Sequence, residues 1–195
     1  MKKFILMWAI AALCTVSAVA PSGWETKIES AFAKARKRSK PVLLVIVDKG
    51  TEKKLNPLAA DKDFAGFAKK YAVCLYLNAD DEKDSARKEK IQNLQQQIFA
   101  KAGKAPHYAV VDGDMNVLVS KKECKMSGIG FIHAISQGIT NLGGSEPAEV
   151  SKLDAKYQQQ AEEKKKAAEK KKKKEKKEKK KKDKKSKNKK DKALN

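Results

Sequence analysis

KPVLLVIV, at residues 40–47, is apolar in each of its last six positions, and the fold prediction starts from it. A short apolar run without polar alternation is typical of a strand that is buried on both faces of a sheet. Pro41 ends the helical pattern that precedes the run, because the residue before a proline disfavours the helical conformation. We therefore predict a central strand with helices packed on both sides of it.

On either side of this strand, helical and strand patterns alternate. Residues 112–114, with the sequence DGD, form a hairpin-turn signal that joins the last two strands. Strands separated by helices form right-handed parallel crossovers, so the sequence predicts an α/β domain with a mixed four-stranded sheet and helices on both faces. The expected helices are 25–38, 57–71, 80–102 and 128–142, and the further strands are 72–78, 106–111 and 116–120.

The N-terminus has the three parts of a secretory signal. Two lysines precede an apolar run at residues 4–19, which ends in the small residues SAVA at 17–20. We expect residues 1–20 to be a signal peptide that is cleaved after Ala20. An uncleaved anchor is the alternative, but the run is short for a membrane span. The chain is then exported to a periplasm or the cell exterior, and envelope association is open.

The charge of the chain is concentrated at its C-terminus. The 195 residues carry a net charge of +21, and residues 151–195 hold 22 Lys and 8 acidic residues, a net +14. Residues 164–192 have almost nothing apolar to bury, so they cannot join a core. We predict a folded domain at 21–147 and a Lys-rich tail at 148–195, helical over 154–168 and frayed or disordered beyond.

The tail is expected to bind a polyanion electrostatically. Counterion release favours such binding at low salt. In an exported protein the candidates are anionic lipid, an envelope polymer and extracellular nucleic acid. Lysines without arginine or aromatic residues are not typical of base readout or stacking. A solubilising tail without a partner is the alternative.

Several short motifs together resemble the thioredoxin-like family, in particular its secreted members. The resemblance covers roughly residues 24–142, and it implies the thioredoxin fold. The motifs, in chain order, are Trp24, AKA at 33–35, KPVLL at 40–44, KKL at 53–55, DKDF at 61–64, LNAD at 77–80, AP at 105–106, VVDGD at 110–114 and VL at 117–118.

The same resemblance implies that the usual redox pair is missing. Aligning KKL at 53–55 with the family places its two cysteines at Lys49 and Glu52, so the motif here is Lys49-Gly50-Thr51-Glu52. Thiol exchange needs a thiolate and a resolving thiol, which neither side chain supplies. The family's cis-proline corresponds to Pro106. Ala105, Pro106 and His107 are the expected peptide-binding residues.

Two cysteines remain in the expected mature chain. Cys74 lies within a predicted buried strand, where we expect it to be a small core residue. Cys124 is flanked by lysines that would lower its pKa, so it is the candidate reactive thiol. A Cys74–Cys124 disulfide stays open as an alternative, although the family's strand order does not place their strands side by side.

The histidines do not suggest a metal site. His107 and His133 are 26 residues apart, with no cysteine or acid at ligand spacing, and each is expected at the surface or a sheet edge. We expect no metal and no cofactor, and the sequence does not indicate an oligomeric state.

The leading hypothesis is an exported, non-catalytic thioredoxin-fold module. It would bind a protein or peptide near Pro106, and its tail would hold it near anionic envelope components. Two alternatives remain, a thiol–disulfide oxidoreductase using Cys124, with or without Cys74, and a polyanion- or nucleic-acid-binding protein.

Overall fold

The computed structural model describes residues 20–48, 51–78, 80, 85–99, 107–121 and 126–169. The chain divides into two compact units, Met1–Glu146 and Pro147–Asn195, and each is considered by itself. The predicted signal peptide lies outside the described residues, apart from Ala20. Within the described part of the chain, no helix is both long enough and apolar enough to span a membrane.

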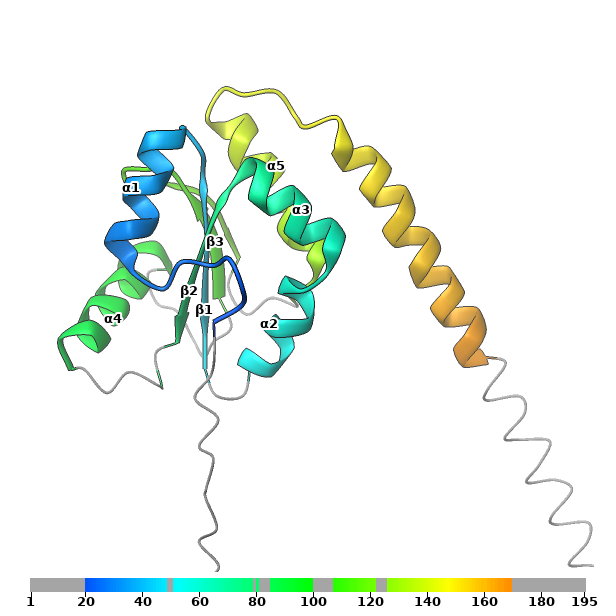
Figure 1. The fold of residues 1–195 in the computed structure, drawn as a ribbon, viewed down its shortest axis with the longest axis horizontal. Helices are drawn as coiled ribbons and strands as arrows, with labels where there is room; N and C mark the ends of the chain where they lie inside the picture. Colours follow the sequence, from blue (N-terminus) through cyan, green and yellow to red (C-terminus); the bar gives the residue numbers. More distant parts are fainter. Residues whose placement is uncertain are drawn as a thin grey trace, which may run out of the picture. The chain divides into compact units, whose positions relative to one another are not determined.

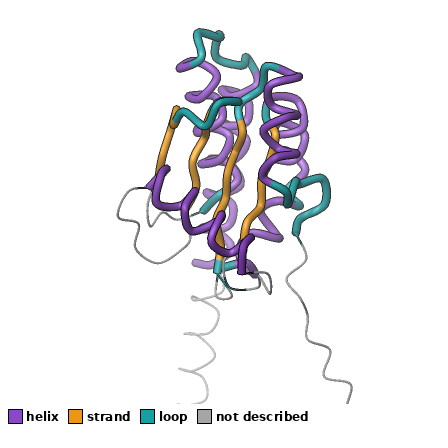
Figure 2. The backbone as a smooth tube through the Cα atoms, turned by 90° about the vertical axis from the view of Figure 1, so that its left-hand side faces the viewer, coloured by secondary structure: helices purple, strands orange, loops and turns teal. Residues whose placement is uncertain are grey.

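The first unit contains a four-stranded mixed sheet in the order β2-β1-β3-β4 (Figures 1 and 2). Strand β1 is parallel to β2 and antiparallel to β3, and β3 is antiparallel to β4. These neighbours and directions are those of the thioredoxin fold, so the predicted fold class is confirmed. The strand bounds are Val42–Val47 for β1, Val73–Asn78 for β2, His107–Val111 for β3 and Val117–Lys121 for β4.

Helices cover both faces of the sheet, with α1 and α4 on one side and α3 and α5 on the other (Figure 1). The predicted helical region 57–71 is two helices, because Asp61 begins a new one. Its carboxylate accepts hydrogen bonds from the backbone N–H groups of Asp63 and Phe64, at 3.0 and 3.1 Å. The helices are α1 (Ile28–Arg38), α2 (Glu52–Ala59), α3 (Lys62–Tyr71), α4 (Ser85–Phe99) and α5 (Gly128–Asn141).

The two faces of the sheet bury different kinds of side chain. On the α1 and α4 side the core cluster is mainly aliphatic, with Phe32 and Phe99 as its aromatic members. The α3 and α5 side has an aromatic row. The ring of Phe131 lies 5.4 Å from Phe64 and 5.0 Å from Tyr108, with an edge-on contact to the latter. Alternation along each strand directs successive side chains into these two layers.

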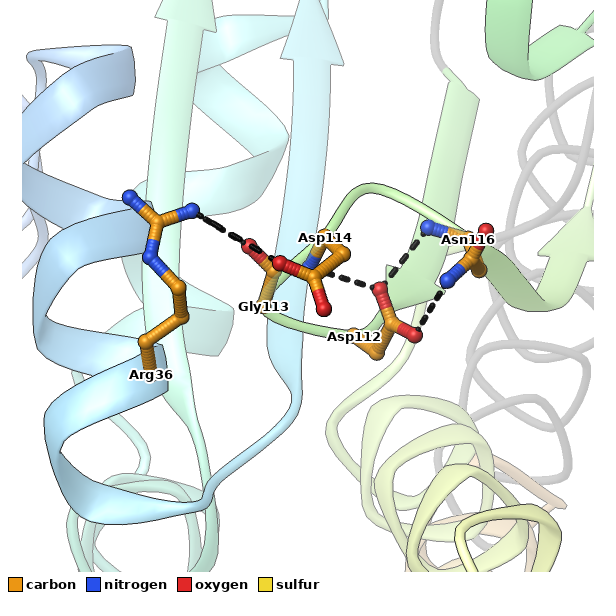
Figure 3. Close-up of polar contacts among 5 residues, drawn as sticks. All are labelled: Arg36, Asp112, Gly113, Asp114 and Asn116. Carbon is orange, nitrogen blue, oxygen red and sulfur yellow. Dashed lines mark hydrogen bonds and ion pairs between the residues drawn. The ribbon is translucent and has the colours of Figure 1, made fainter.

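A polar contact ties the β3–β4 turn to the end of α1 (Figure 3). Arg36 donates a hydrogen bond to the carbonyl oxygen of Gly113 at 2.9 Å, and its guanidinium lies 3.9 Å from Asp114. Inside the turn, the carboxylate of Asp112 accepts hydrogen bonds from the backbone N–H groups of Asp114 and Asn116 and from the Asn116 amide. Burial opposes ionisation of Asp112, but these hydrogen bonds outweigh it and lower its pKa.

Among the described residues of the second unit, 149–169 form a helix. The predicted helix at 154–168 is therefore confirmed, and it begins five residues earlier than expected. Residues 149–169 hold five lysines and five acidic residues, so this helix has no net charge. Residues 170–195 contain 17 Lys and 4 acidic residues, a net +13, and they lie outside the described part.

The close packing of α5 on β3 gives a matched pair of glycine substitutions. A Cβ atom at Gly138 would lie 2.5 Å from Cγ1 of Val110, whereas a Cβ atom at Gly66 in α3 would meet nothing within 4 Å. We expect Gly138→Ala to lower the free energy of unfolding by about 1–3 kcal/mol through overpacking. Gly66→Ala should raise it by about 0.5–1 kcal/mol through helix propensity. Urea denaturation measures both, and equal effects would contradict the α5–β3 contact.

Candidate functional site

The candidate site lies where β1 ends and α2 begins, the place that the resemblance assigns to redox chemistry. Asp48 follows the last residue of β1, and Thr51 is the N-cap residue of α2. Lys49 and Gly50 lie outside the described residues, and only the backbone of Glu52 is described. The described part of the motif is therefore Thr51 together with the Asp48 that precedes it.

Asp48 and Thr51 hydrogen-bond to each other and close this turn. The backbone N–H of Asp48 donates to Oγ1 of Thr51 at 3.0 Å. The backbone N–H of Thr51 donates to Oδ1 of Asp48 at 2.9 Å, and the Thr51 hydroxyl donates to the same oxygen at 2.8 Å. The backbone N–H of Thr51 also donates to the carbonyl oxygen of Asp48 at 3.1 Å. The two residues form a pair of reciprocal side-chain and backbone bonds over a spacing of three residues.

This pair sets the chemistry of the described part of the site. Thr51 is nearly buried, at 9 % exposure, and its hydroxyl proton is directed at a carboxylate. A carboxylate and a hydroxyl cannot carry out thiol–disulfide exchange, which needs a thiolate to attack and a second thiol to resolve the intermediate. The Thr51 hydroxyl makes no hydrogen bond to the α2 backbone, since it is turned toward Asp48.

His107 is placed differently from the prediction. It was expected at the surface or a sheet edge, but it is fully buried and pairs with Ile46 of the central strand. Its ring lies 5.2 Å from the ring of Phe99, in the layer between the sheet and α4. The alternation of β3 explains this result, because His107 shares a face with Ala109 and Val111 of the core cluster. Its ring is therefore not part of an exposed peptide-binding surface. His133 is exposed, as predicted.

The other two predicted binding residues, Ala105 and Pro106, are located only through His107, which follows them in the chain. Ala105 and Pro106 lie outside the described residues, directly before His107. Because His107 is the register partner of Ile46, the start of β3 and the end of β1 meet at one end of the sheet. The turn formed by Asp48 and Thr51 is at this same end.

Cys74 is a core residue, as expected. Its thiol is free and only 8 % exposed, and burial raises its pKa to about 12. Cys74 is the register partner of Leu43, five residues before Asp48, which places it about 16 Å along the strand from the candidate site. Cys74 therefore cannot replace a redox cysteine at the end of β1.

Cys124 lies outside the described residues, in the segment that follows β4. Strands β4 and β2 form opposite edges of the sheet, separated by β1 and β3. This arrangement agrees with the expectation that the strands preceding Cys124 and containing Cys74 are not neighbours. Among the side chains that the structure describes, no three His, Cys, Asp or Glu residues are grouped so that they could hold a metal ion.

Sequence reasoning missed the hydrogen-bonded pair of Asp48 and Thr51. The available signal was the i, i+3 spacing of an aspartate and a threonine after a strand, which is typical of local side-chain-to-backbone turns. The resemblance to the family instead indicated Lys49 and Glu52, the positions that correspond to its cysteines.

Comparisons with known proteins add a structural likeness. No protein-family model matches the chain. No curated protein matches it. It is similar to a solved structure titled DsbH oxidoreductase, with 17% sequence identity and a TM-score of 0.49, over 63% of this chain and 88% of that one. At this level of similarity the fold assignment rests on the strand order and directions described above.

The hydroxyl of Thr51 provides a direct test of the turn. Thr51→Val keeps the shape of the side chain but leaves the backbone N–H of Asp48 without its acceptor, so we expect it to lower the free energy of unfolding by about 1–3 kcal/mol. Thr51→Ser retains the hydroxyl and should cost less than half as much. Urea denaturation of the two variants measures the difference, and equal losses would show that the hydroxyl bonds do not stabilise the turn.

Proposed function

We propose that this chain is an exported thioredoxin-fold protein that does not carry out thiol–disulfide exchange at the family's redox position. Its folded domain binds a protein or peptide at the end of the sheet where β1 ends and β3 begins, and its cationic tail holds it near anionic envelope components. The observation that carries this proposal is the turn at the start of α2, which is closed by Asp48 and Thr51.

The chemistry of the motif supports a binding role. The positions that correspond to the redox pair are Lys49 and Glu52, and neither residue supplies a thiol. A turn held by four short polar contacts, with Thr51 almost buried, is a rigid element, and rigid elements lower the entropic cost of binding a partner. The family's peptide contact is made beside its cis-proline, which the resemblance places at Pro106.

A second candidate function is a thiol-dependent activity of Cys124. The observation that favours it is the cluster of Lys121, Lys122 and Lys125 around that cysteine, since neighbouring positive charge favours the thiolate. Cys74 is a poor resolving partner for such an activity because its thiol is buried and its pKa is raised to about 12. The binding role and the thiol role differ in whether Cys124 is required.

The charge distribution along the second unit supports attachment through the tail. The helix at 149–169 is electrically neutral, and a helix of this length extends about 30 Å. The net +13 of residues 170–195 follows it without interruption. The electrostatic attraction of the second unit to an anionic surface is therefore concentrated in its last 26 residues.

An insulin-reduction assay distinguishes the two functions of the folded domain. The full chain is expected to show no turnover above the reductant alone, because the redox positions lack thiols, and Cys124→Ser should not differ from it. The positive control is the double substitution Lys49→Cys with Glu52→Cys, which restores the family's spacing. Activity in the wild type that disappears in Cys124→Ser would overturn the binding role in favour of the thiol role.

The tail is tested by vesicle sedimentation with the full chain and a chain ending at Glu169. We expect the full chain to bind vesicles containing anionic phospholipid at about 50 mM salt and to lose most of this binding at about 500 mM. The shortened chain lacks the net +13 and should bind far less at low salt. Residues 1–20 are common to both chains, so they cannot account for a difference. Equal binding of both chains would leave the tail a solubilising role only.

A further inference from the structure

A cleft of about 400 Å³ lies beside the edge strand β2, away from the candidate site. Its walls come from residues 22–25, from α1 and α3, and from the first residues of β2. The backbone of Glu25 fixes the N-terminal wall. Its N–H donates to the carbonyl of Cys74 and its carbonyl accepts from the N–H of Tyr76, both at 2.8 Å. The volume falls within the range of about 300–1,000 Å³ that is usual for small-molecule sites.

Apolar side chains form the inner part of the cleft. Trp24 lines the cleft, and its ring rests on the fully buried ring of Phe64, with the two centroids 6.2 Å apart. Helix α3 adds Ala65 and Ala68, which lie three residues apart on one side of the helix and leave room because they are small. The cleft can therefore accommodate an aliphatic or aromatic group.

Positively charged side chains also line the cleft. Lys34 and Arg38, one turn apart on α1, line the cleft together with Lys69 of α3. The one acidic residue among the lining residues is Glu25, and its two carboxylate oxygens are already bound by Lys34 and by the Ser30 hydroxyl. Within the described residues, Arg38 and Lys69 have no carboxylate at ion-pair distance. With Lys34, Arg38 and Lys69 against the single carboxylate of Glu25, the lining of the cleft has two more cations than acids.

The surroundings of Lys40 show the same excess of positive charge. Lys40 donates a hydrogen bond to the carbonyl oxygen of Lys69 at 3.1 Å, so it lies beside the α3 wall. Burial, and then the nearby charge of Arg38, lower the pKa of Lys40. An anion placed at the cleft would reduce this repulsion between like charges.

We propose that this cleft binds a small monocarboxylate with an apolar body, such as a medium-chain fatty acid. The carboxylate contacts Arg38 and Lys69, and the hydrocarbon part packs on Trp24 and Ala65. The binding is non-covalent, because the thiol of Cys74 at the back of the cleft is buried. This site is separate from the Asp48 and Thr51 turn, so it does not depend on the function proposed for that end of the sheet.

Trp24 makes the test direct. The chain has two tryptophans, Trp8 and Trp24, so Trp8→Phe leaves Trp24 as the single reporter in the full-length protein. Decanoate is titrated below its micelle concentration while Trp24 emission is recorded. We expect a saturable change in emission at one site per chain. Decanol lacks the charge, so its affinity should be lower than that of decanoate by about tenfold or more.

Matched charge reversals locate the carboxylate. Arg38→Glu with Lys69→Glu should weaken decanoate binding about tenfold or more, whereas Lys37→Glu with Lys62→Glu changes the net charge equally at exposed positions of α1 and α3 outside the cleft and should have little effect. Ala65→Leu fills the apolar part of the cleft without changing its charge and should also weaken decanoate binding. This variant tests the proposal if the protein with the Arg38→Glu and Lys69→Glu substitutions does not fold. Unsaturable emission changes, equal affinity for decanol, or equal effects of the two double variants would overturn the proposal.

Discussion

The burial of β1 on both faces is the constraint on which the rest of the first unit depends. All six of its side chains, from Val42 to Val47, have no measurable exposure. Such a strand needs a neighbour on each side for its backbone and a layer of helix on each face for its side chains. β2 and β3 are the neighbouring strands. α1 and α4 form the helical layer on one face, and α3 and α5 form the layer on the other (Figure 1). The mixed directions follow from the connections, since α2 and α3 cross over to β2 while β3 runs back along the other side.

The same strand determines where the chemically interesting groups lie. A doubly buried strand can present polar groups only at its ends, and Asp48 is the first polar residue after Val47. In the thioredoxin-like family this position leads directly into the redox cysteines. Here Asp48 and Thr51 hydrogen-bond to each other at the strand end. A fold does not by itself imply a chemistry, which depends on the few residues at the site.

The sequence was sufficient to predict the architecture because the informative patterns were long or sharply bounded. The apolar run at 42–47 predicted a central strand and the DGD sequence at 112–114 predicted a hairpin turn, and both predictions are confirmed. The side-chain positions were harder to predict. His107 is polar and was expected to be exposed, but the alternation of β3 places it in the core against Phe99. The cleft beside β2 could not be predicted, because Trp24, Arg38 and Lys69 come together only when α1, α3 and the N-terminal segment have packed around the sheet edge.

The pairing of Glu25 with β2 also affects how the protein behaves among its own copies. An uncovered edge strand offers backbone N–H and C=O groups to any extended chain, and this is a common start of aggregation. β2 is an edge strand of the sheet, and it is apolar along almost its whole length. By occupying the carbonyl of Cys74 and the N–H of Tyr76, the short segment around Glu25 takes the place that another molecule's strand would need. The residues just after the predicted cleavage point thus protect the sheet from self-association.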